Sequence, residues 1–220
     1  MREAYRDQLG QLADQLADMC SMVGEAMSLA TRALLETDLA IAEQVIGDDV
    51  KVDDARSRTE EDAYALLALQ APVATDLRTV LAVIHAAESL ERMGDLALHV
   101  AKAARRRHPN PVLPDAVRGY FAEMGEVAGR MATQAEQVIR TQDVALARAL
   151  DETDDEMDDL HQHLFTVLMD REWPHGVAAA VDVTLLGRFY ERFADHAVSV
   201  ANRVVFVVTG KMPGYSTDDL

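Results

Sequence analysis

The sequence predicts an all-α protein built from two tandem antiparallel three-helix bundles, one an internal repeat of the other. Good helix formers dominate the chain, while aromatic residues make up only 5% of it. The six prolines divide this helix-favouring sequence at nearly regular intervals, and proline is poorly tolerated inside a helix. The two halves also share aligned residues, which is the mark of a duplicated structural unit.

The first half, residues 1–108, is expected to hold three long helices. An N-cap near Asp38 separates the first helix from the second, because an Asp side chain accepts hydrogen bonds from the free amides of a new helix. Pro72 ends the second helix and begins the third. The third ends in the basic run Arg105–Arg107, which is expected to complement the carbonyl end of that helix. A rigid, proline-rich connection follows.

The second half, residues 115–210, repeats this plan. Asp143 offers the corresponding N-cap, and Pro174 followed by Gly176 offers the corresponding break. Long helices joined by short turns must lie antiparallel and side by side, which predicts one bundle in each half. Residues 211–220 contain Gly, Pro, Ser and Asp and are expected to form a loosely ordered tail.

Charge and composition exclude several classes of function. The chain has 38 acidic and 21 basic residues, and its formal charge of −17 repels nucleic-acid backbones and anionic lipid surfaces. No apolar run approaches the roughly 20 residues that span a bilayer, so direct membrane insertion is not expected. The single Cys20 cannot form an internal disulfide, and the N-terminal stretch lacks the features of a secretory signal. A cytoplasmic location is therefore expected.

Carboxylates interrupt the apolar stripes of four helices. The stripe of the third helix runs through Leu77, Leu81, Ile84, Glu88, Glu91, Asp95 and Leu98. Its spacing of four and three residues predicts burial against neighbouring helices. The other three helices carry Asp49 and Asp53, Asp154 and Asp158, and Glu191 and Asp195 in comparable stripes. Like charges one turn apart repel each other, so water, basic side chains or bound cations must offset the repulsion.

Two interpretations of these acidic stripes remain open. In the first, the carboxylates line a solvated groove or are neutralised by Arg56, Arg78, Arg92, Arg188 and Arg192. In the second, carboxylates on facing helices converge on bound cations, and the duplication favours this interpretation. All-oxygen ligation selects hard or borderline cations, of which iron or manganese is expected first.

Neighbouring residues refine the second interpretation. Glu88 aligns with Arg188, so the first site is expected to bind cations more strongly than the second. His99 and His161 lie within one turn of an acidic pair, but a single histidine on a helix is more often an ordinary surface or core residue. Neither histidine is counted as a ligand.

Two segments resemble the PhoU family of phosphate-responsive regulators. They are DLRTVLAVIHAAESLERMGDLALHVAK, from Asp76 to Lys102, and GRFYERFADHAVSVANRV, from Gly187 to Val204. The stretch LALQAPVATDLR, from Leu67 to Arg78, and the two Asp-x-x-x-Asp pairs support the resemblance. It extends over nearly the whole chain, from about Tyr5 to Gly210.

The resemblance implies paired three-helix bundles that carry multinuclear metal on their acidic faces, with magnesium and zinc as alternatives to iron or manganese. The ligands that it implies are Asp49, Asp53, Glu91 and Asp95, with Glu88 as a further candidate, and in the second half Asp154, Asp158, Glu191 and Asp195. The second motif departs from the pattern by having Ala194 where the first has Gly94. Less metal is therefore expected at the second site.

The resemblance also implies a function. Members of the family are cytoplasmic negative regulators that link a phosphate ABC transporter, here through its ATPase subunit, to a sensor histidine kinase, and hold the phosphate-starvation response off when phosphate is plentiful. No enzymatic turnover is expected, and a homodimer is expected because long amphipathic bundles often pair. The alternative is a carboxylate-bridged metalloenzyme or a metal-handling helical protein. An enzyme would need an open coordination position beside a pocket.

Overall fold

The computed structural model describes residues 2–171 and 173–211, and these are helical apart from turns and connections. The helices in these ranges are α1 (Arg2–Glu36), α2 (Leu39–Gln70), α3 (Thr75–Arg107), α4 (Asp115–Thr141), α5 (Val144–Leu168) and α6 (Gly176–Thr209). The all-α prediction is confirmed, and three helices fall in each predicted half. Of the expected tail, residues 212–220 lie outside the described residues.

Both predicted N-caps are present. Asp38 precedes α2, and its Oδ1 accepts a hydrogen bond from the amide of Ile41 at 3.1 Å. Asp143 precedes α5 and accepts hydrogen bonds from the amides of Ala145 at 2.8 Å and Leu146 at 3.3 Å. Such side chains satisfy amides that have no partner inside the helix, so these two residues mark where the middle helix of each half begins.

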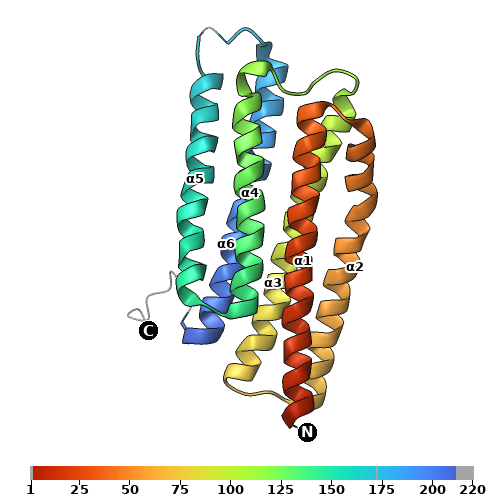
Figure 1. Ribbon diagram of the computed structural model, residues 1–220, viewed down its shortest axis with the longest axis vertical. Helices are drawn as coiled ribbons and strands as arrows, with labels where there is room; N and C mark the ends of the chain where they lie inside the picture. The colour runs from red at the N-terminus through yellow and green to blue at the C-terminus, as the bar shows by residue number, and fades with distance from the viewer. Residues whose placement is uncertain (1, 172, 212–220) are drawn as a thin grey trace.

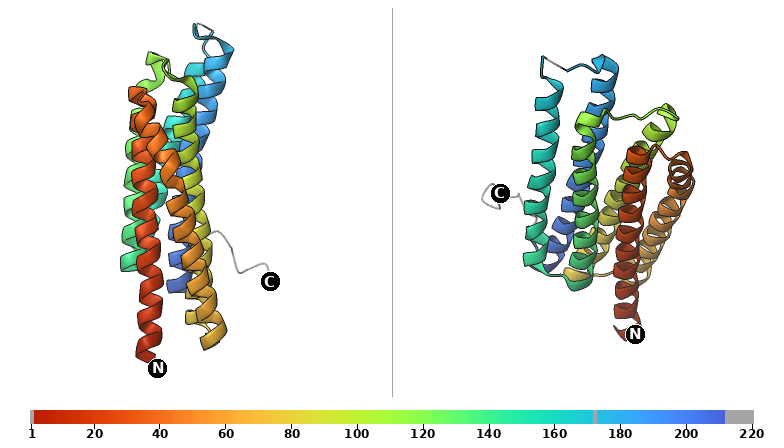
Figure 2. Two further views of the ribbon diagram at one scale, coloured as in Figure 1. Left: turned by 90° about the vertical axis from the view of Figure 1, so that its right-hand side faces the viewer. Right: turned by 45° about the horizontal axis from the view of Figure 1, so that its top comes forward.

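The six helices lie side by side along the long axis of the molecule, with α1 and α4 in front of α3 and α6 in Figure 1. Within each half, α1 packs against α2 and α3, and α4 packs against α5 and α6. The halves meet through α1 against α4 and α3 against α6. In the side view of Figure 2, the red α1 and the blue α6 lie on opposite sides. The helices α2, α3, α6 and α5 thus form one broad layer, which α1 and α4 cover on one face.

A single hydrophobic core runs through both halves. Leu90 of α3, Phe121 of α4 and Tyr190 of α6 are fully buried members of one continuous cluster. The hydroxyl oxygens of Tyr190 and Thr31 are 2.7 Å apart, which joins α6 to α1 across the boundary between the halves. The helices follow the predicted plan, but the two sets of three share their apolar interior.

Charged side chains close one end of this boundary. Arg106 and Arg107, at the end of α3, contact the buried carboxylate of Asp182 near the start of α6 at 2.8 and 2.5 Å. Arg105 lies 3.6 Å from Glu43 of α2. Arg106 and Arg107 thus bind a carboxylate of another helix besides lying at the carbonyl end of their own, because the antiparallel α6 places Asp182 within their reach.

The predicted acidic stripe of α3 lies at the edge of the core and not within it. Leu77, Leu81 and Glu88 are exposed, and Glu91 and Asp95 are half-buried. The expected burial of this stripe holds for Leu98 but fails for Leu77, Leu81 and Glu88, because α3 packs against α1, α2 and α6 at once. Three neighbours give this helix a wide buried face, and the acidic stripe borders that face.

Two further expectations concern membrane insertion and the single cysteine. In the described part of the chain, no helix combines the length and the apolarity that crossing a bilayer requires. Cys20 is buried in α1, and burial raises the pKa of its thiol, which keeps it protonated and unreactive near neutral pH.

Candidate cation sites on paired helices

In the first half, α2 and α3 bring four predicted carboxylates together. Asp49 and Asp53 lie one turn apart on α2, and Glu91 and Asp95 lie one turn apart on α3. Burial raises the pKa of Asp49, and the charges of Asp53 and Asp95 raise it further. Burial also raises the pKa of Glu91, where Asp95 and Asp53 add to the effect and two arginines oppose it. The acidic pairs of the two helices are therefore close enough to repel each other.

Two arginines neutralise part of the first site. Arg56 of α2 donates from Nε to Glu60 at 3.0 Å, and its Nη1 lies 3.6 Å from Glu91. Arg92 of α3 lies 3.5 Å from Glu91 through Nε and donates from Nη1 to Asp95 at 3.0 Å. The interpretation that arginines compensate the carboxylates is thus confirmed for Glu91 and Asp95. Oε2 of Glu91 nevertheless is buried without a hydrogen-bond partner.

The other three candidates of the first half lack an arginine partner. The carboxylates of Asp49 and Asp53 form no ion pair or hydrogen bond in the described ranges. Glu88 is exposed, and its closest basic group is Nδ1 of His85 at 4.0 Å. The structure therefore places Asp49 and Asp53 with the acids of α3, and places Glu88 at the margin of the site.

In the second half, α5 and α6 repeat the arrangement with less compensation. The pKa of Asp154 is raised to about 6, first by burial and then by the charges of Asp158 and Asp195. Burial raises the pKa of Glu191, and Asp195 adds to it while Arg188 opposes it. Arg188 forms an ion pair with Glu191. Within the described residues, the carboxylates of Asp154, Asp158 and Asp195 have no ion pair or hydrogen bond.

His161 occupies the position that corresponds to Arg56. Its ring lies against α6, where Nε2 is 3.6 Å from the place of a Cβ at Gly187. This nitrogen is buried and has no hydrogen-bond partner. Burial lowers the pKa of His161, Arg188 lowers it further and Asp158 opposes the shift. The sequence argument set this residue aside, although its alignment with the arginine of the first site was a signal that it faces the carboxylates.

The carboxylates of each site gather without converging on one point. Among the residues that the structure describes, no three His, Cys, Asp or Glu side chains form a group that holds an ion as they stand. The donor chemistry nonetheless fits a hard or borderline cation, because carboxylate oxygens dominate and Oε2 of Glu191 is buried without a partner. Carboxylates one turn apart on facing helices reach a common ion by rotating about their own side-chain bonds.

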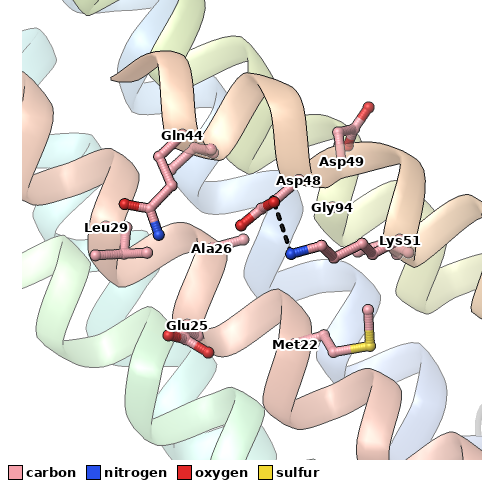
Figure 3. A pocket seen from close by; sticks show the side chains of 11 residues that line it. Met22, Glu25, Ala26, Leu29, Gln44, Asp48, Asp49, Lys51 and Gly94 are labelled. Atoms are coloured by element: carbon pink, nitrogen blue, oxygen red, sulfur yellow. Dashed lines mark ion pairs between the residues drawn. The ribbon is translucent and has the colours of Figure 1, made fainter. Parts of the chain in front are cut away.

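A cavity of about 220 Å³ adjoins the first site between α1 and α2. Figure 3 shows Asp49 beside it and the ion pair of Asp48 with Lys51, 2.7 Å long, on its α2 side. Gly94 of α3 also lines the cavity, and a Cβ added there would lie 3.2 Å from a methyl group of Val52. The glycine of the first motif therefore allows α2 and α3 to approach closely beside the carboxylates.

Known proteins match this chain over nearly its whole length. The family model described as "PhoU domain" matches residues 16–104 and 121–204, one match in each half. The "Phosphate-specific transport system accessory protein PhoU homolog 2" of Mycobacterium tuberculosis is 59% identical over 97% of this chain and 100% of its own length. The "PhoU homolog 1" of Mycobacterium leprae is also 59% identical, over 97% of this chain and 96% of its own length.

Solved structures share the fold. The crystal structures of "the phosphate transport system regulatory protein PhoU from Streptococcus pneumoniae" and of "PhoU from Pseudomonas aeruginosa" both superpose with a TM-score of 0.82 at 24% identity. They cover 94% of this chain, and 98% and 100% of theirs. The family model covers most of both halves, and the mycobacterial relatives match almost from end to end. The chain therefore belongs to the PhoU family.

Proposed function

We propose that this chain is a cytoplasmic accessory protein of phosphate transport that represses the phosphate-starvation response when phosphate is plentiful. The observation that carries this proposal is the 59% identity, over nearly the whole chain, to relatives named phosphate-specific transport system accessory proteins. In this role the chain is an adaptor between the ATPase subunit of a phosphate ABC transporter and a sensor histidine kinase. Its output is a coupling free energy between the states of these two partners and involves no turnover.

The adaptor binds cations at the two acidic sites. The first site uses Asp49, Asp53, Glu91 and Asp95, with Glu88 at its margin, and the second uses Asp154, Asp158, Glu191 and Asp195. Support comes from the raised pKa values of Asp49 and Asp154, since carboxylates that repel each other gain most from a positive ion. Iron or manganese is expected first, and magnesium or zinc next. Such an ion supplies positive charge that holds two helices together.

Repression is tested by deleting the gene and measuring a phosphate-responsive promoter at high phosphate. The promoter is expected to become active in the deletion strain and to fall silent again when the chain is supplied in trans. A promoter that stays silent in the deletion strain contradicts the regulatory function. A further variant replaces the eight proposed ligands other than Glu88 by Asn or Gln. If this variant still restores repression, the cations are dispensable for repression.

Homodimer formation also stays a proposal, and sedimentation of the purified chain at several concentrations tests it. The rival class, a carboxylate-bridged metalloenzyme, predicts metal-dependent turnover that is lost with the ligands. No observation supports the metalloenzyme as strongly as the 59% identity to phosphate transport accessory proteins supports the regulatory function.

A further inference from the structure

We propose that the groove between α5 and α6 docks an amphipathic helix of a partner protein, one that carries aliphatic side chains in its first half and Lys or Arg in its second. This inference rests on the proposed adaptor function, because an adaptor needs a surface that a partner recognises. The groove lies on the broad layer of helices, beside the second acidic site.

The apolar part of the groove has a volume of about 480 Å³. Its wall on α6 consists of Val177, Val181 and Leu185, which follow one another at one-turn intervals and are 80%, 50% and 48% exposed. Leu168 and Trp173 line the opposite side, at the end of α5 and in the turn that follows. Aliphatic side chains left in water in a continuous row mark an interaction surface more often than scattered ones do.

The dimensions of this row fit a helix. Val177 to Leu185 covers two helical turns, about 12 Å at 1.5 Å per residue. A partner helix that lies along α6 places residues i, i+3, i+4 and i+7 against such a row, which is the usual way in which an amphipathic helix fills a groove. Phe165 of α5 is also exposed and extends the apolar surface toward the acidic site.

Beyond Leu185 the surface carries the acids of α5 together with Arg188 of α6, which is paired with Glu191. The carboxylates of Asp151, Asp154, Asp155 and Asp158 lie on α5 and have no ion pair in the described part of the chain. Asp151 and Asp155 are near enough to Asp154 to raise its pKa, so these charges form one field. Asp151 and Asp155 are exposed and are not among the proposed cation ligands, so they stay available to basic side chains on the second half of the partner helix, while a second copy of this chain, with a formal charge of −17, would add to the repulsion.

The first repeat provides a matched surface that differs at two key positions. Leu77 and Leu81 correspond to the two valines, but His85 stands where Leu185 stands. Glu60 stands where Phe165 stands and accepts a hydrogen bond from Arg56. Leu77 and Leu81 are themselves 37% and 41% exposed, so both halves carry aliphatic side chains on this surface. The row continues through Leu185 and Phe165 only in the second half, and this continuity favours the second half as the docking half.

The test uses the full-length chain without added metal and a fluorescently labelled synthetic helix with Leu at positions i, i+3, i+4 and i+7 followed by two turns rich in Lys and Arg. Saturable binding by fluorescence anisotropy is expected. The double variant Phe165→Glu with Leu185→His, which installs the residues of the first repeat, is expected to weaken binding about tenfold or more. The control Leu77→Asn with Leu81→Asn is expected to change binding less than about twofold. Melting curves confirm that both variants fold.

Charge is tested with a second peptide in which Glu replaces every Lys and Arg. Its binding is expected to be about tenfold weaker, and binding of the basic peptide is expected to weaken as NaCl rises from about 50 to about 300 mM.

Equal binding of both peptides, or unchanged binding to the Phe165→Glu, Leu185→His variant, overturns the proposal. A wild-type dimer that this variant converts to a monomer also overturns it, because the groove is then a contact between copies. Absence of peptide binding beside intact repression in cells contradicts the groove alone and leaves the regulatory function standing.

Discussion

The two repeats place carboxylates on the same backbone positions and surround them with different bases. In the first repeat, Arg56 and Arg92 together contact both acids of α3. In the second, His161 stands in place of Arg56, and Arg188 reaches only Glu191. A duplicated fold therefore keeps the acidic pairs and varies the charges that balance them, which sets how strongly each site needs a cation.

This comparison bears on one expectation from the sequence, the order of cation affinity, which stays untested. The replacement of Glu88 by Arg188 predicted a stronger first site, but the structure shows Glu88 at the margin. Asp151 and Asp155 add negative charge near Asp154, whereas Lys102 adds positive charge near Asp49. These charges favour the opposite order, with tighter binding at the second site, and we propose that order for testing. The predictions below test how far the repeats are alike, from the largest effect to the smallest.

The largest effect concerns the core that both repeats share. Leu90→Ala removes a fully buried side chain, and we expect a loss of about 3 kcal/mol of unfolding free energy. Because the core runs through both halves, urea unfolding followed by circular dichroism is expected to show one transition at a lower midpoint. Two separated transitions, with only the first one shifted, would mean that the repeats fold independently.

The next effect concerns the charged contact at the boundary. Asp182→Ala installs the residue that the first repeat has at position 82, and it removes the carboxylate that Arg106 and Arg107 share. We expect a loss of about 2 kcal/mol, because hydrogen bonds to a buried charged group exceed ordinary ones in strength. The control Arg105→Ala breaks only an exposed contact with Glu43 and is expected to cost less than about 0.5 kcal/mol. Equal losses of unfolding free energy in both variants would show that the buried Asp182 contact stabilises the fold no more than an exposed ion pair does.

A smaller effect concerns the repulsion at the second site. The pKa of Asp154 is raised to about 6, so the folded chain binds this proton more tightly than the unfolded chain does. Stability from this group is therefore present at low pH and lost as the pH rises from about 4 to about 6. In chelator-treated protein, Asp154→Asn is expected to raise stability at pH 7 by about 1 kcal/mol, a value reduced for solvent screening, and to flatten that part of the pH profile. The matched variant Asp49→Asn is expected to raise the stability at pH 7 by less. A larger gain from Asp49→Asn would mean that repulsion is stronger at the first site.

The smallest effect concerns the difference in cation affinity between the sites. We expect Glu191→Ala with Asp195→Ala to lower the bound metal more than Glu91→Ala with Asp95→Ala does. The expected difference in affinity is a few-fold, below about 1 kcal/mol. Elemental analysis after dialysis against limiting manganese or iron measures it. Equal losses would show that the arginines do not distinguish the sites, and no metal in the wild-type chain would contradict cation binding altogether.

Much of the fold could be predicted because its signals are local. Asp38 and Asp143 cap helices through their own side chains, and the prolines break helices wherever they stand. Spacing also placed each acidic pair on one face of its helix, since residues one turn apart share a face, and the resemblance to the PhoU family implied which pairs meet. The predicted burial of the stripe that includes Leu81 failed, because it assumed one packing seam where α3 has three neighbours.

The sequence by itself determined the helices, their repeat and the carboxylates that face one another in each half. Only the tertiary structure decided that Arg106 and Arg107 bind Asp182, that the halves share a core, and that His161 faces the second acidic site. The physical reason is range. Capping and helix periodicity act between residues a few positions apart, whereas these contacts depend on how whole helices from distant parts of the chain are placed against each other.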